Sequence, residues 1–203
     1  MYFLLPAAPS SPLDKNTDVV FLLDGSEGVK AQIFEQQKIF VESLVNQFFI
    51  LPNGPQASII TYGGDPVTTA DFGDPSLVSK LRRSSLVGTA RRMDKALQHA
   101  AFVLDRQTRK GPKTVILLTA GKDNADAKPL IEAKKALDEL SAQVYVVAIG
   151  QDPDSQALTP VVDRSRDIFI IPRTSDLSSR ARPIASSSKH SAHNFLKILG
   201  LFI

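Results

Sequence analysis

Continuous apolar runs alternate with amphipathic segments along most of the chain. Four runs predict strands buried on both faces, as a parallel sheet covered by helices requires: Val19–Leu23, Val115–Leu118, Val144–Ile149 and Ile168–Ile171. Apolar positions that recur every three to four residues predict helices over Ala31–Phe49, Met93–Leu104 and Leu130–Leu140. Strands that alternate with helices predict a doubly wound α/β fold with a mostly parallel sheet and helices on both faces.

Two shorter apolar segments predict one antiparallel edge strand on this sheet. Ala57–Tyr62 and Val67–Phe72 are separated by Gly63-Gly64-Asp65-Pro66, whose residue types favour a turn. In a doubly wound sheet, ligands bind beyond the carboxyl ends of the strands. We therefore expect functional residues in the loops Asp24–Gly28 and Thr119–Asp123, which follow two of the buried strands.

The length and composition fit one globular domain with short additional segments. The chain has 203 residues, a formal net charge of +3 and no cysteine. The absence of cysteine excludes disulfides, thiolate metal sites and cysteine catalysis. We predict a leader at residues 1–16, a domain at 17–177 and an atypical tail at 178–203 that ends in the apolar segment Phe195–Ile203. The sequence predicts no transmembrane span, and the first residues lack the basic region of a convincing signal peptide.

The residues that could support catalysis lack the partners that catalysis requires. Asp24 has Ser26, not a second acid, two residues later, unlike the phosphatases that use an aspartate nucleophile. The chain contains no dinucleotide-binding Gly-x-Gly-x-x-Gly motif, and Gly25–Lys30 lacks the spacing of a phosphate-binding loop. His99 lies near the apolar stripe of its predicted helix, and His190 and His193 lie in the tail. We therefore predict a protein that is not an enzyme.

Three ordered segments resemble the von Willebrand factor type A domain family. Thr17–Ser26 resembles its first strand and loop, Val87–Leu97 its Gly-Gly-x-x-Thr-x-Thr-Gly-x-Ala-Leu region, and Lys110–Lys122 its Pro-Lys-Val-x-x-x-Leu-Thr-Asp-Gly strand. Phe-Leu-Leu-Asp-Gly-Ser at residues 21–26 looks most like the A domains of collagen VI α chains, with matrilin-type proteins next. The resemblance implies an extracellular-matrix interaction module with matrix partners such as collagens or sister A domains, and no nucleic acid partner. The helix that normally closes the family's fold is doubtful after Leu177.

The resemblance also implies a metal-ion-dependent adhesion site, in which oxygen ligands from three loops hold Mg²⁺. Asp24 and Ser26 match the first two ligands. Gly28, Arg91 and Ala120 stand where the family has Ser, Thr and Asp, and Thr89 is two residues out of register. Asp123 and Asp126 lie beyond the matching position. We therefore expect a degenerate site without a metal cofactor.

Arg91 provides a physical substitute for the missing ion. If its guanidinium points into the crevice, it pairs with Asp24 through a charge-assisted hydrogen bond and neutralises the acid that a metal would neutralise. The alternative is that Arg91 points to solvent beside Arg92.

A run of five bases without an acid provides a further candidate binding site, for a sulfated glycosaminoglycan: Lys80, Arg82, Arg83, Arg91 and Arg92. A solvated helix face is the alternative. Three functions therefore stay open: a metal-independent matrix module, an adhesion domain that requires a divalent cation, and a glycosaminoglycan-binding module.

Overall fold

The computed structural model describes residues 11, 13–48, 50, 53–121, 127–150, 155–173 and 175–177. Most of the predicted leader and the whole predicted tail, with its apolar end and two histidines, lie outside these residues. The last part of the leader contacts the domain. Leu13 packs against the core, and the Ser11 hydroxyl donates a hydrogen bond to the Phe48 carbonyl at 2.6 Å.

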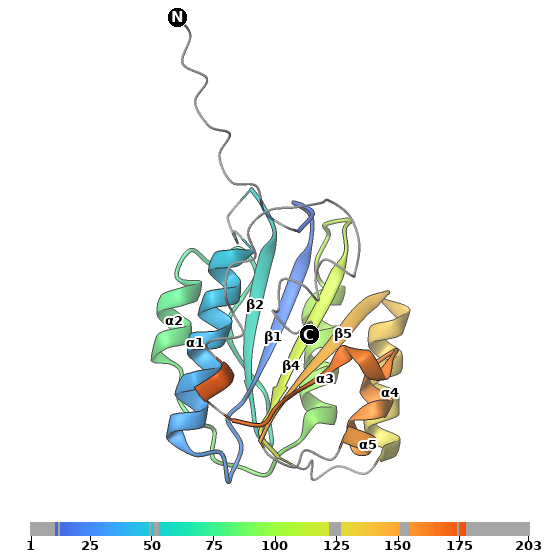
Figure 1. Cartoon of the computed structure of the whole chain (residues 1–203). Helices are drawn as coiled ribbons and strands as arrows, with labels where there is room; N and C mark the ends of the chain where they lie inside the picture. Colours follow the sequence, from blue (N-terminus) through green and yellow to red (C-terminus); the bar gives the residue numbers. More distant parts are fainter. Residues whose placement is uncertain are drawn as a thin grey trace, which may run out of the picture.

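The described strands form one six-stranded sheet in the order β3-β2-β1-β4-β5-β6 (Figure 1). Their bounds are β1 Asp18–Asp24, β2 Gln56–Tyr62, β3 Val67–Ala70, β4 Lys113–Thr119, β5 Ala142–Ile149 and β6 Ile168–Ile171. Only the β2–β3 pair is antiparallel. The predicted mostly parallel sheet with an antiparallel edge strand is confirmed, and the carboxyl ends of its five parallel strands lie at one edge.

Helices cover both faces of the sheet. The described helices are α1 Ala31–Gln47, α2 Leu77–Arg83, α3 Met93–Asp105, α4 Ala127–Glu139 and α5 Ser155–Leu158, with short 3₁₀ turns at Thr159–Val161 and Ser165–Asp167. The helices α1 and α2 lie on one side of the sheet and α3 and α4 on the other (Figure 1). The doubly wound architecture is therefore confirmed.

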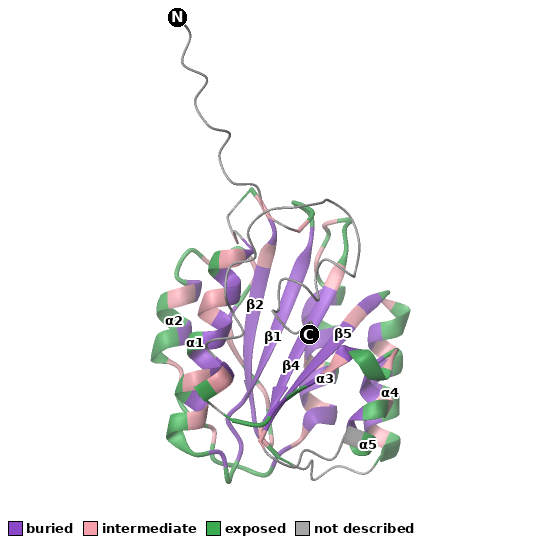
Figure 2. Ribbon diagram, in the orientation of Figure 1, coloured by how far each residue is buried: buried purple, intermediate pink, exposed green. Residues whose placement is uncertain are grey.

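The continuous apolar sequence of β1 follows from its central place between two cores. All seven of its residues are buried (Figure 2). Val19, Phe21 and Leu23 face the core beneath α1 and α2, whereas Val20 and Leu22 face the core beneath α3 and α4. Successive strand residues point to opposite faces, so a strand covered on both sides needs an apolar residue at nearly every position.

One helix is missing from the pattern predicted by the sequence, whereas a helix start near residues 174–177 was expected. The helix α2 was not predicted, because it is short and only Leu77 and Leu81 are buried along it. At the other end of the domain, residues 175–177 have helical backbone, and Leu177 is fully buried in the core beneath α1. The chain after β6 therefore returns to the α1 face of the sheet.

Candidate functional site

Asp24 is the last residue of β1 and is fully buried at the carboxyl edge of the sheet. Pairing between β1 and β4 ends at Leu22, two residues earlier. The fully buried side chain of Gln37 in α1 binds the backbone of Asp24 beyond that point. Its Oε1 accepts a hydrogen bond from the Asp24 N–H at 2.9 Å, and its Nε2 donates to the Asp24 carbonyl at 3.0 Å. The Gln37 amide thus replaces the hydrogen bonds of a neighbouring strand and fixes the direction in which Asp24 points.

Four donors from the described residues surround the Asp24 carboxylate. Oδ2 accepts hydrogen bonds from Arg91 Nε at 2.7 Å and from the Ala120 backbone N–H at 2.8 Å. Oδ1 accepts from the Ser26 hydroxyl at 2.5 Å and from the Ser26 backbone N–H at 3.2 Å. The expected contact between Arg91 and Asp24 is therefore present.

Arg91 is buried with its partner: its side chain is 9% exposed and that of Asp24 is 0% exposed. Gly121 provides the space for the guanidinium, since a Cβ atom at that position would lie 2.7 Å from Arg91 Nη1. Two loops from distant parts of the sequence therefore enclose one buried ion pair. A buried charge without a partner costs several kcal/mol, so the arginine and the aspartate depend on each other.

The other positions of the metal-site motif lie close by but form different contacts. Gly28 has a φ of +85°, in the left-handed region that favours glycine, so this loop is shaped for a residue without a side chain. The Thr89 hydroxyl accepts a hydrogen bond from the Gly64 N–H at 2.6 Å, and its carbonyl accepts one from the Glu27 N–H at 2.7 Å. Asp123 and Asp126 lie outside the described residues.

Two groups at this site were missed by the sequence analysis, Gln37 and the N–H of Ala120. Gln37 is a polar residue within the apolar stripe of α1, which is a signal that could have been noticed. The backbone N–H of Ala120 could not be recognised from the sequence, because every residue except proline has a backbone N–H.

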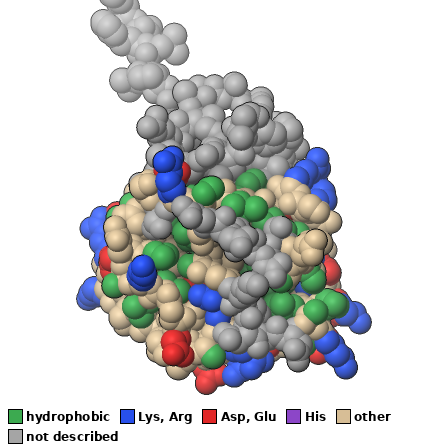
Figure 3. All heavy atoms as spheres, turned by 60° about the horizontal axis from the view of Figure 1, so that its bottom comes forward, with side chains coloured by type: hydrophobic (Ala, Val, Ile, Leu, Met, Phe, Trp, Pro, Cys, Tyr) green, Lys and Arg blue, Asp and Glu red, His purple; other side chains and the backbone are tan. Residues whose placement is uncertain are grey.

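The five bases of the predicted glycosaminoglycan site lie in different environments. Three of them form ion pairs: Lys80 with Asp74, six residues earlier, at 2.5 Å, Arg82 with Glu42 of α1, and Arg92 with Asp94, two residues later, at 2.6 Å. Arg91 is buried against Asp24. On the view of the molecule that brings this edge of the sheet forward, Lys and Arg side chains lie at several separate places (Figure 3).

Two of these ion pairs lower the pKa of their carboxyl group. The hydrogen bond from Arg82 lowers the pKa of Glu42, and the hydrogen bond from Lys80 lowers the pKa of Asp74. Arg83 differs from the other four: its Nε donates to the Ser79 carbonyl at 3.2 Å, and no carboxylate of the described residues lies within ion-pair distance of it.

His99 lies at the boundary of the core on α3, and its Nε2 is 2.8 Å from the Thr68 hydroxyl. Burial lowers its pKa below 6.5, and the charge of Asp71 opposes this effect only in part.

A histidine whose folded-state pKa is depressed contributes stability above its unfolded pKa and loses that contribution as the pH falls through the folded pKa. We expect His99→Gln to reduce the loss of melting temperature between about pH 7.5 and about pH 5.5. Equal losses in the two proteins, measured by thermal melts, would contradict this expectation.

No helix in the described part of the chain is long and apolar enough to cross a membrane. Within the same residues, no group of three or more His, Asp or Glu side chains is arranged to hold a metal ion.

Residues 18–180 match the model of the von Willebrand factor type A domain family, and the chain belongs to that family. Human collagen α-1(XXI) chain is 24% identical over 159 residues, covering 76% of this chain and 16% of the collagen. Human von Willebrand factor A domain-containing protein 2 is 34% identical over 143 residues, covering 66% of this chain and 18% of that protein. Mouse collagen α-5(VI) chain is 25% identical over 150 residues, covering 70% of this chain and 6% of the collagen.

The chain therefore spans less than a fifth of the length of each of these relatives. The collagen VI resemblance is confirmed in part, since a collagen VI chain is found beside collagens of other types. Among solved structures, proximal thread matrix protein 1 of the mussel byssus, with a zinc-occupied MIDAS motif, has a TM-score of 0.72 at 21% identity. That match covers 84% of this chain and 47% of the mussel protein and shows a shared fold.

Proposed function

We propose that this chain is a non-enzymatic, metal-independent protein-interaction module of the extracellular matrix, related to the A domains of collagen VI. The single observation that carries the proposal is the buried bond between Arg91 and Asp24 at the edge of the sheet where the family binds its metal ion. The guanidinium supplies permanently the positive charge that Mg²⁺ supplies in an adhesion site.

The residues at this edge fit a divalent cation poorly. Each oxygen of Asp24 already accepts two hydrogen bonds, so a metal ion would have to displace donors that are covalently part of the fold. The Arg91 guanidinium would repel the ion, and Ala120 offers no side-chain oxygen. Mg²⁺ requires near-octahedral coordination by oxygen ligands, which two surviving ligand positions do not provide.

The matrix location and the absence of catalysis are supported by the relatives. Several of the similar proteins are collagens, and the carboxylate at this site is neutralised by a buried arginine. The partners of such a module would be matrix proteins, such as collagens or sister A domains.

Thermal melts test the metal-independent state. We expect the melting temperature of the full chain to be the same in millimolar Mg²⁺, Mn²⁺ or Zn²⁺ as in EDTA. A cation present at about a hundred times its dissociation constant would stabilise the fold by about 2.7 kcal/mol, a shift of several degrees. The mussel thread matrix protein, whose metal site has been seen with zinc, is the positive control for the assay. A cation-dependent shift in this chain would support the divalent-cation adhesion domain instead.

Binding to matrix proteins tests the second half of the proposal. We expect immobilised collagen VI to retain the full chain equally in Mg²⁺ and in EDTA. Retention that EDTA abolishes would contradict metal independence, and no retention on any collagen would contradict the proposed class of partner.

A further inference from the structure

A groove lies between α2, the loop that follows it and the β2–β3 hairpin, about 510 Å³ in volume. We call it the α2 groove. Its volume lies in the range of ordinary ligand sites, which is roughly 300–1,000 Å³. It opens beside the site described above but uses none of the groups around Asp24.

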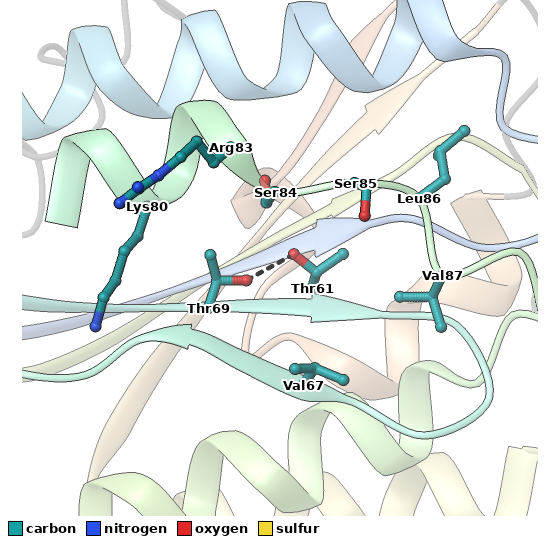
Figure 4. A pocket seen from close by; sticks show the side chains of 9 residues that line it. All are labelled: Thr61, Val67, Thr69, Lys80, Arg83, Ser84, Ser85, Leu86 and Val87. Carbon is teal, nitrogen blue, oxygen red and sulfur yellow. Dashed lines mark hydrogen bonds between the residues drawn. The ribbon is translucent and has the colours of Figure 1, made fainter. Parts of the chain in front are cut away.

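The side chains along the α2 groove are sorted by chemistry (Figure 4). Lys80 and Arg83 occupy the end beside α2. Leu86 and Val87 lie at the opposite end, and hydroxyl groups, among them those of Ser84 and Ser85, lie between the two ends. None of the described residues that line the groove is acidic. The groove therefore has a basic end, a polar middle and an apolar end.

Arg83 is the cation of the groove that is available to a ligand. Lys80 is already paired with Asp74 at 2.5 Å. Arg83 is exposed and donates through Nε to a backbone carbonyl, with no carboxylate partner among the described residues. A guanidinium binds a carboxylate strongly and in a defined orientation, because its donors match the two carboxylate oxygens.

The opposite end of the groove is apolar and accessible. Leu86, at this end, is 37% exposed, and Val67, on the β3 side of the groove, is 56% exposed (Figure 4). Burial of such side chains against an aliphatic side chain of a partner is favourable in proportion to the apolar area removed from water. An occupant that satisfies both ends carries an acid and an aliphatic group on one extended backbone.

We propose that the α2 groove binds an acidic peptide segment of a partner protein, with an Asp or Glu side chain on Arg83 and an aliphatic side chain between Val67 and Leu86. The proposal rests on the proposed function in one respect, that the domain binds proteins. A sulfated polysaccharide fits less well, because it needs a row of uncompensated bases. Arg82 and Arg92, the nearest candidates in the sequence, are paired with Glu42 and Asp94.

Selection from a random 12-residue peptide library displayed on phage tests the proposal with the full chain in EDTA. We expect the enriched peptides to share an acidic residue and an aliphatic residue. The consensus peptide, labelled with a fluorophore, is then measured by fluorescence anisotropy against the parent chain and its variants.

The decisive variants are Arg83→Gln and the matched Arg82→Gln on the same helix. We expect Arg83→Gln to weaken binding roughly tenfold and Arg82→Gln to change it less than twofold, because Arg82 is paired and does not line the groove. Leu86→Ser, on the exposed loop, should weaken binding several-fold. Unchanged melting temperatures show that the variants are folded.

Several results would overturn the proposal. They are the absence of any enriched peptide, a consensus without acids, equal binding by Arg83→Gln and the parent, or Arg83-dependent binding of a heparin dodecasaccharide in place of a peptide. Peptides that bind the parent and Arg83→Gln equally would contradict peptide binding in the α2 groove, but they would not contradict the proposed interaction module. A chain that binds the peptide but is not retained by collagen would contradict the proposed matrix function and would still support peptide binding in the α2 groove.

Discussion

Replacement of Arg91 by methionine is expected to lower the free energy of unfolding by about 3–5 kcal/mol, the range for breaking one side of a buried ion pair. The substitution keeps an unbranched apolar stem but removes the charge beside Asp24, whose side chain is fully buried. Of its hydrogen bonds within the described part of the chain, the carboxylate would then keep those from Ser26 and Ala120. Urea denaturation of the parent and the variant measures the difference.

Two further variants separate the buried pair from a general effect of removing arginine. Arg82→Met removes an arginine that is 66% exposed in its own ion pair, and we expect little change. Asp24→Asn in the Arg91→Met background should recover part of the loss, because it removes the uncompensated charge. A small effect of Arg91→Met alone, or no recovery in the double variant, would show that the pair does not stabilise this edge of the sheet.

Gln37→Leu is expected to cost about 3 kcal/mol, although it places an apolar side chain in an apolar environment. The substitution leaves the N–H and the carbonyl of Asp24 without their partners, and each unsatisfied buried group costs about 1–3 kcal/mol. The same urea titration measures this effect.

The matched control is Gln32→Leu, which makes the same change at an exposed position of the same helix. We expect a change within about 0.5 kcal/mol there. A Gln37→Leu variant as stable as the parent would mean that water or a shifted backbone replaces the glutamine amide.

The sequence predicted the fold well because burial on two faces leaves a strong pattern. The run Val19–Leu23 corresponds to β1, Asp18–Asp24, and the Ala31–Phe49 stripe to α1, Ala31–Gln47. The pattern missed α2, where burial of Leu77 and Leu81 is the only periodic signal in seven residues. A hydrophobic period needs more than two turns to be visible, so short helices are the elements that sequence alone does not reveal.

The candidate site was predictable only where a change of residue type marks it. Arg91 stands where the family motif has a threonine ligand, and this replacement suggested the contact between Arg91 and Asp24 that the structure contains. The run of five bases, in contrast, carried no information about their partners. Glu42 reaches Arg82 only through the packing of α1 against α2. Pairing between distant segments is a property of the fold and is absent from local sequence.

The buried pair also determines the order in which single substitutions could convert this edge of the sheet into a metal site. Arg91→Thr as a first step leaves the buried charge of Asp24 without its partner, and the fold is destabilised before any ion can bind. Ala120→Asp as a first step adds an acid to the loop that already contacts Arg91, so the guanidinium compensates part of the new charge. Gly28→Ser adds roughly 1–2 kcal/mol of backbone strain at a φ of +85°. This substitution is tolerated best as the last step, when the free energy of ion binding offsets the strain. The mutational path is therefore directional, and the arginine has to be the second residue to change.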